Sequence, residues 1–394
     1  MDKRSPAAHQ DVPVVSLELE NLLGYAQRET GLMEFGDEDF LEPLRILLAC
    51  AEREARLHRL GRVALHDMVL HALSNRLHLQ SYWKRHPQVL DFHIRSAVFI
   101  VGMPRTGTTL LFNLLTQDPT HRWFTNWEAK TPAPSPNCAT DQRRDFALEA
   151  KRISMRLLPG LRPIHQVGPD DPEECGVLLQ NSFETEHFGI PFDIPSYLDW
   201  LRKRERTASY RYYQNQLKVL QHQRPGRRWL LKAPAHIMAL DALLAVFPDA
   251  NVIQTHRDPL KAVPSFCSLV AANRGISTAV TDRQRLGEET AAWLSAGLNR
   301  CFEVRRGAAD RFHDVRYQSL LQDPIGTVET IYRRFGFDMT QETLRRMRSY
   351  LRDNPQYKHG VHRYSLASFG LDADSERKRF STYIASFDVP LERE

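Results

Sequence analysis

Apolar residues recur at helical spacing over the first part of the chain. Leu19, Leu22 and Leu23 fall on one helical face, and the same spacing returns further along the segment from residue 16 to about 95. Residues 1–15 lack this pattern and are expected to form a flexible tail. No recognisable chemistry marks the helical segment, so we expect an N-terminal helical extension that serves as a lid or packing layer.

Short runs of apolar and β-branched residues follow, and each leads into a segment with helical spacing. We expect these runs to be buried strands at 97–101, 229–231, 251–255 and 313–317. Strands that alternate with helices favour an α/β fold, here three α/β/α layers around a central parallel sheet in a P-loop-like domain. We place this domain at 96–394, with helical acceptor-binding insertions at about 130–228.

Charge and hydropathy exclude several classes of partner. The chain has 394 residues, 42% of them apolar, and a net charge of +5, with basic and acidic residues interleaved. Without a long basic run, we expect no nucleic-acid partner. No apolar stretch reaches the length of a membrane span, and no secretory leader is evident, so we expect a cytoplasmic protein. The oligomeric state stays open, with a homodimer among the alternatives.

The cysteine and histidine spacings give no sign of a metal site. The five cysteines are scattered without a CxxC pair, which argues against both a disulfide framework and zinc. No HxxxH or HExxH spacing occurs either. We therefore expect chemistry that needs no bound metal.

The segment Gly102-Met103-Pro104-Arg105-Thr106-Gly107-Thr108-Thr109 carries the strongest chemical signal. It lies between an expected strand and an expected helix, and its two glycines have the GxxxxG spacing of a phosphate-binding loop. Backbone N–H groups and the helix N-terminus can surround phosphate oxygens there. In a loop that binds nucleoside triphosphates, lysine would stand where this chain has Thr108, and the cation is instead Arg105.

At this loop the sequence resembles the sulfotransferase superfamily, and within it the bacterial sulfotransferase family. The family's 5'-phosphosulfate loop reads Pro-Lys/Arg-Ser/Thr-Gly-Thr-Thr, and Pro104 to Thr109 match it at every position. Tyrosylprotein sulfotransferases have a similar loop with arginine. The resemblance implies 3'-phosphoadenosine 5'-phosphosulfate as the donor of a sulfuryl group. It implies a loop that binds the donor through Pro104, Arg105, Thr106, Gly107, Thr108 and Thr109.

A second candidate phosphate site lies further along the chain. Arg257 follows an expected strand and Ser265 comes eight positions later. An arginine can bind a phosphate with two parallel hydrogen bonds, and a hydroxyl can add a third. In the family, an Arg and a Ser at this spacing hold the donor's 3'-phosphate. By the same resemblance Tyr317 contacts the adenine side, and His362 and Tyr364 belong to a segment that closes over the nucleotide.

Two side chains compete for the role of general base. Glu128 stands near the position of the catalytic glutamate in tyrosylprotein and some bacterial sulfotransferases, and His236 resembles the catalytic histidine of the cytosolic family. Histidine needs less tuning to accept a proton near neutral pH, whereas a glutamate needs its pKa raised by burial. Arg105 and Arg257 are expected to stabilise the charge that develops on the leaving phosphate, with help from Lys232 just past the second expected strand. We favour Glu128 slightly over His236.

Two alternative functions and the acceptor stay open. The loop spacing also fits a small-molecule kinase that uses ATP and magnesium, and the domain could bind nucleotide without catalysing a reaction. The acceptor is expected to be a small molecule with a hydroxyl or amine, of aromatic or lipid-like type. This expectation rests on the aromatic residues of the insertion, which could equally form core. They are Phe183, Phe188, Phe192, Tyr197 and Trp200.

Overall fold

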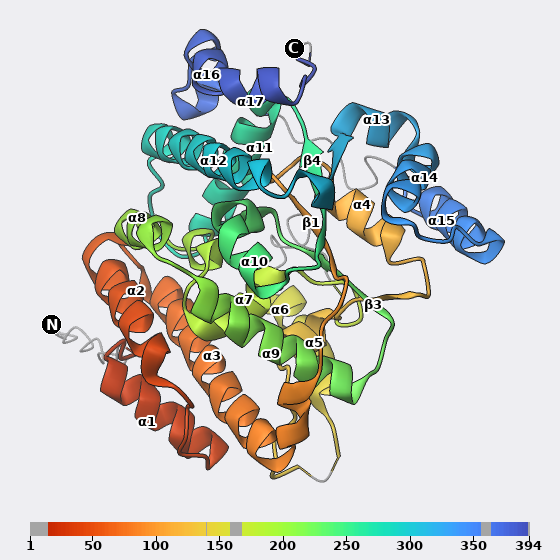
Figure 1. The fold of residues 1–394 in the computed structure, drawn as a ribbon. Helices are drawn as coiled ribbons and strands as arrows, with labels where there is room; N and C mark the ends of the chain where they lie inside the picture. The colour runs from red at the N-terminus through yellow and green to blue at the C-terminus, as the bar shows by residue number, and fades with distance from the viewer. Residues whose placement is uncertain (1–14, 139, 158–167, 356–363, 393–394) are drawn as a thin grey trace, which may run out of the picture.

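Five parallel strands form the centre of the molecule (Figure 1). The computed structural model describes the whole chain except residues 1–14, 139, 158–167, 356–363 and 393–394. The strand order is β2-β3-β1-β4-β5. The strands span Val98–Gly102 (β1), His121–Arg122 (β2), Arg228–Lys232 (β3), Asn251–His256 (β4) and Phe312–Arg316 (β5). The predicted α/β fold with a central parallel sheet is confirmed.

Helices cover both faces of the sheet, as the alternation of side chains along β1 requires. Phe99 and Val101 belong to a core shared with α9, α10, α11 and α12, whereas Val98 and Ile100 belong to a core shared with α4, α14 and α15. All five residues of β1 are buried, which explains why its sequence is a continuous apolar run. The helices span Thr207–Gln223 (α9), Leu240–Val246 (α10), Pro259–Arg274 (α11), Arg283–Arg306 (α12), Thr108–Leu115 (α4), Pro324–Phe335 (α14) and Gln341–Asp353 (α15).

The N-terminal helices pack against a later part of the chain. Helices α1 (Leu19–Thr30), α2 (Leu41–Glu54) and α3 (Arg59–Arg85) share a core with the segment around α8 (Pro195–Lys203). Figure 1 shows this group on one side of the sheet domain. The aromatic residues that suggested an acceptor pocket lie in this core: Phe183, Phe188, Phe192 and Tyr197 are buried and Trp200 packs against them. These aromatic side chains are therefore packing residues.

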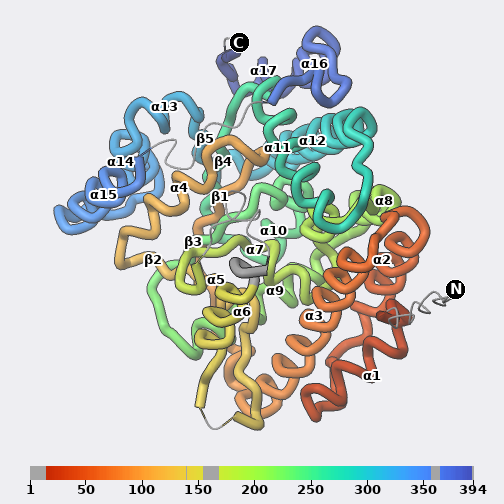
Figure 2. The backbone as a smooth tube through the Cα atoms, turned by 180° about the vertical axis from the view of Figure 1, so that it is seen from behind, coloured from red at the N-terminus to blue at the C-terminus, as the bar shows by residue number. Residues whose placement is uncertain are grey.

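The remaining α-helices of the described residues lie outside the groups above. They are α5 (Asn126–Lys130), α6 (Arg143–Leu157), α7 (Cys175–Leu179), α13 (Tyr317–Gln322), α16 (Ala373–Arg379) and α17 (Ser381–Ser386). Figure 2 shows α5, α6 and α7 grouped near β3, and α16 and α17 beside α11 and α12. Within the described ranges, no helix is long and apolar enough to cross a membrane.

Candidate functional site

The carboxyl edge of the sheet brings together several of the residues that the sequence singled out. From β1 the chain first runs to β2 at one edge of the sheet. It then returns through β3 and crosses to β4 and β5 on the other side of β1. Such a reversal in strand order opens a ligand-binding crevice at the carboxyl ends of the strands. Lys232 ends β3, the glycine-rich loop follows β1, Arg257 follows β4, and Tyr317 follows β5.

Two glycines allow the loop after β1 to lie close to its neighbours. Gly102 has φ 142°, and a Cβ there would lie 2.6 Å from the Thr255 carbonyl oxygen on β4. Gly107 has φ 88°, and a Cβ there would lie 2.9 Å from the Tyr317 ring. Any side chain at either position would push the loop away from β4 or Tyr317.

The threonines and the proline of the loop have different surroundings. The Thr106 hydroxyl donates to the Met103 carbonyl oxygen over 2.6 Å, so this buried side chain braces the loop from within. Pro104 and Thr108 are also buried, and Thr109 is exposed in the first turn of α4. Arg105 and Thr109 are therefore the exposed residues of the loop, and the loop leads into the N-terminus of α4, which suits an anionic ligand.

The two predicted phosphate sites meet in the structure. Arg105 Nε donates to Ser265 Oγ over 3.1 Å, although 160 positions separate the two residues. Arg257 Nη1 donates to the backbone oxygen of Arg105 over 3.0 Å, and its guanidinium lies 4.2 Å from the centre of the Tyr317 ring. One cluster thus contains two arginines, a buried hydroxyl and an aromatic face.

Arg257 has a further partner that sequence reasoning missed. Its guanidinium pairs with both carboxylate oxygens of Glu392, over 2.8 and 3.0 Å. Burial lowers the pKa of Arg257, but Glu392, Tyr317 and Tyr364 outweigh it and raise the pKa above its usual value. Tyr364 is half-buried, and His362 lies outside the described residues.

Glu128 is held by a dense set of contacts at the start of α5. It forms a capping box with Thr125, accepting the Thr125 backbone N–H over 2.8 Å. Its carboxylate also pairs with Arg122 over 2.9 Å and with Arg224 over 3.0 Å. Burial raises the pKa of Glu128, but Arg122, Thr125 and Arg224 outweigh burial and hold it below the usual value. Because the Glu128 side chain is also buried, an acceptor molecule has little access to its carboxylate.

His236 lies in the core beneath the sheet edge. The side chain is buried, and Nδ1 is 2.8 Å from the hydroxyl of Tyr210. Burial, with a contribution from Arg206, lowers the pKa of His236 to about 3. The imidazole is therefore neutral at physiological pH, with aromatic rings of Phe99, Tyr210 and Tyr213 around it.

Lys232 makes an ion pair with the carboxylate of Glu174. The ammonium group is buried, and Glu174 is one-third exposed. Lys232 also lies 5.6 Å from the ring centre of Phe112, in the helix that follows the phosphate loop. Because Lys232 pairs in register with Ile100, two residues before Gly102, this ion pair lies beside the start of the loop.

Residues 97–341 match the model of the sulfotransferase family. This chain belongs to that family. The sulfotransferase is similar to solved structures of STF1 from Mycobacterium tuberculosis, with 32% identity and a TM-score of 0.83 over 94% of this chain and 99% of that one. It is similar to STF9 from Mycobacterium avium, with 29% identity and a TM-score of 0.87 over 98% of this chain and 99% of that one.

A curated relative has a named activity. The omega-hydroxy-beta-dihydromenaquinone-9 sulfotransferase Stf3 of Mycobacterium bovis is 28% identical to this sulfotransferase over 287 residues. The match covers 66% of this chain and 68% of that relative. The sequence-based resemblance to bacterial sulfotransferases is therefore confirmed.

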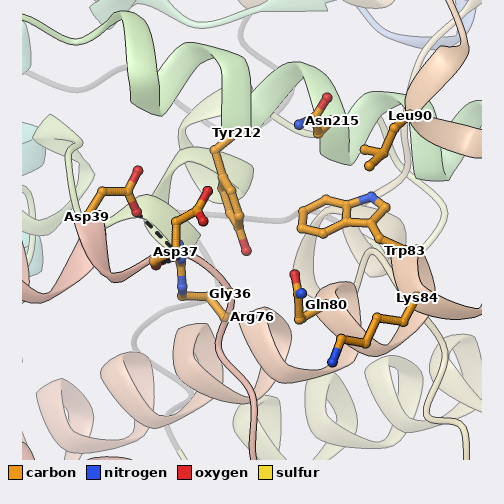
Figure 3. Close-up of a pocket in the computed structure, with 10 residues that line it drawn as sticks. All are labelled: Gly36, Asp37, Asp39, Arg76, Gln80, Trp83, Lys84, Leu90, Tyr212 and Asn215. Carbon is orange, nitrogen blue, oxygen red and sulfur yellow. Dashed lines mark hydrogen bonds and ion pairs between the residues drawn. The ribbon is translucent and has the colours of Figure 1, made fainter. Parts of the chain in front are cut away.

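A separate cavity of about 360 Å³ lies between the N-terminal helices and α9 (Figure 3). Arg76, Trp83 and Tyr212 line it, together with Asp37 and Asp39 and five other residues. The Arg76 guanidinium lies 4.4 Å from the centre of the Tyr212 ring. None of the sequence-predicted site residues lines this cavity.

The buried, neutral His236 should make the stability of this sulfotransferase depend on pH. Between about pH 3 and pH 6.5 the unfolded chain binds a proton at this position and the folded chain does not, so stability falls as pH falls. One such proton changes the free energy of unfolding by roughly 1.4 kcal/mol per pH unit. In urea unfolding from pH 7 to pH 5, His236→Asn should show a smaller pH slope than the unchanged protein. The exposed His93 provides a control, since His93→Asn should leave the slope unchanged. If His236→Asn shows the same pH slope as the unchanged protein, the expectation is wrong.

Proposed function

We propose that this sulfotransferase transfers a sulfuryl group from 3'-phosphoadenosine 5'-phosphosulfate to a hydroxyl of a small acceptor. The observation that carries the proposal is the cluster of Arg105, Ser265, Arg257 and Tyr317 at the carboxyl edge of the sheet. A nucleotide with phosphates on both the 3' and 5' sides needs two anion sites close together. The glycine-rich loop supplies one, and Arg257 with Ser265 supplies the other.

In the proposed reaction, the acceptor oxygen attacks the sulfur in line with the bond to the 5'-phosphate. The new oxygen–sulfur bond forms as the sulfur–oxygen bond to phosphate breaks, and adenosine 3',5'-bisphosphate leaves. Arg105 extends from the exposed face of the loop and would neutralise the growing charge on the leaving phosphate. Lys232, at the end of β3, would add a second positive charge beside the loop.

We propose Glu174 as the base that takes the proton of the acceptor hydroxyl. Its ion pair with Lys232 places its carboxylate beside the phosphate loop, and it is one-third exposed, so an acceptor can reach it. Glu128 and His236, the candidates from the sequence, have contacts that favour structural roles. Glu128 stabilises a helix start between two arginines, and His236 is fully buried beside Tyr210.

For the acceptor we propose the hydroxyl of a lipid-like small molecule. The support is the relative Stf3, whose name specifies an omega-hydroxylated dihydromenaquinone. A screen with isotopically labelled donor should include long-chain alcohols, hydroxylated isoprenoids and phenols. We expect label transfer to the first two classes to exceed transfer to phenols, and the reverse order would contradict the proposed acceptor class.

The donor proposal predicts a specific pattern of thermal stabilisation. Adenosine 3',5'-bisphosphate at about 100 times its Kd should stabilise the protein by roughly 2.7 kcal/mol. For a chain of 394 residues we expect a rise in Tm of roughly 3 °C. The shift should not require magnesium, because both anion sites consist of side chains and backbone N–H groups. If ATP with magnesium raises the Tm and adenosine 3',5'-bisphosphate does not, the result would instead favour a kinase.

A further inference from the structure

The last described residues of the chain fold back onto the proposed donor site. Tyr383 in α17 is buried, and its hydroxyl lies 3.4 Å from the backbone nitrogen of Arg257. Val389 is also buried, and the backbone N–H of Glu392 donates to Asp258 over 2.8 Å. Because the segment is attached at both points, it delivers the Glu392 side chain to Arg257.

The contact between Glu392 and Arg257 has the geometry of a bound anion. Arg257 Nε and Nη2 each donate to one oxygen of the carboxylate, over 2.8 and 3.0 Å. The two side chains are only 14% and 20% exposed. Guanidinium groups bind carboxylates and phosphates through the same pair of N–H groups, so one fork cannot hold both at once.

Arg257 would keep its position without Glu392. Its Nη1 donates to the backbone oxygen of Arg105, and its guanidinium lies over the Tyr317 ring. Neither contact uses Nε or Nη2. Departure of the carboxylate would therefore leave these two N–H groups directed at whichever anion replaces it.

We propose that Glu392 is an internal competitor for the 3'-phosphate of the nucleotide and thereby sets the affinity of the enzyme for its donor. The carboxylate must leave the Arg257 fork before a 3'-phosphate can enter it. This inference rests on the proposed function, since it takes Arg257 as the 3'-phosphate site. If Glu392 fills the fork in about nine molecules of ten, the apparent Kd is about tenfold weaker than that of the open form.

Calorimetric titration of the full chain with two nucleotides tests the proposal. Adenosine 3',5'-bisphosphate carries the 3'-phosphate, and adenosine 5'-monophosphate lacks it. In Glu392→Gln we expect the Kd of the bisphosphate to fall roughly tenfold, with the Kd of the monophosphate unchanged. The matched control is Asp388→Asn on the same segment. Asp388 is 91% exposed and pairs with Arg316, so its loss should change neither Kd.

The outcomes separate this inference from the function on which it rests. Tighter bisphosphate binding in Glu392→Gln that disappears in the double variant with Arg257→Ala supports competition at the fork. An unchanged Kd overturns the competition, and so does weaker binding, which would mean that Glu392 positions Arg257. If the unchanged protein and all variants fail to bind the bisphosphate, the proposed function itself is wrong and the inference falls with it.

Discussion

Replacing Arg105 by alanine is expected to lower kcat for sulfuryl transfer by roughly two to three orders of magnitude, the usual effect of removing one charge-stabilising donor. Arg105 is exposed, and its Nε hydrogen bond to Ser265 is the contact that links the loop to α11. Because the backbone of Arg105 accepts the Arg257 hydrogen bond, the substitution should leave that contact intact. The measurement is label transfer from isotopic donor to the best acceptor of the screen.

A matched substitution separates this loss from a general effect on the backbone. Arg105 and Arg56 are both exposed arginines with positive φ, 69° and 48°. Arg56→Ala should have unchanged kcat, and both variants should unfold at similar urea concentrations. If Arg105→Ala retains full activity, Arg105 does not stabilise the leaving phosphate.

Replacing Glu174 by glutamine is expected to reduce kcat by roughly two to four orders of magnitude, because the acceptor hydroxyl would lose its base. The amide keeps a hydrogen-bond acceptor for the buried Lys232, but the loss of its counter-charge should lower the free energy of unfolding, so kcat is measured at a temperature where urea unfolding shows the variant to be folded. The Kd for adenosine 3',5'-bisphosphate should stay the same, since Arg105 and Arg257 are untouched. Label transfer and calorimetry measure the two quantities separately.

Three other variants in the same assay discriminate among the candidate bases. Glu173 is buried and accepts a hydrogen bond from the Asn126 side chain, so Glu173→Gln controls for a change of charge at the neighbouring position. Glu128→Gln should lower stability through the loss of two ion pairs, with little effect on the rate of the folded enzyme. If kcat falls in Glu128→Gln or in His236→Asn but not in Glu174→Gln, the assignment of Glu174 is incorrect.

The apolar runs predicted four of the five strands to within one residue at each end, because buried parallel strands need continuous apolar side chains. The short edge strand β2, His121–Arg122, has no such run and was not predicted. Helix α13 was also missed, since it begins at Tyr317 directly after β5. Edge strands and single-turn helices depend on their neighbours more than on their own sequence.

The candidate site was predictable where a local motif existed. The loop at 102–109 carries its own glycine spacing, but the pairs Lys232–Glu174 and Arg257–Glu392 join residues 58 and 135 positions apart without a motif. Glu128 is a different case. Thr125 and Glu128 form the T-x-x-E pattern of a capping box, which could have indicated a structural role from sequence.

The strand order also constrains when the proposed donor site can form during synthesis. β1 is made early, yet its two neighbours in the sheet, β3 and β4, begin at Arg228 and Asn251. A growing chain must therefore hold the loop after β1 without its supports while more than a hundred further residues emerge. Contacts this distant in sequence slow folding and leave apolar strands exposed for longer. The proposed nucleotide-binding surface should thus form late in folding, and binding of adenosine 3',5'-bisphosphate should report on whether a nascent molecule has completed its sheet.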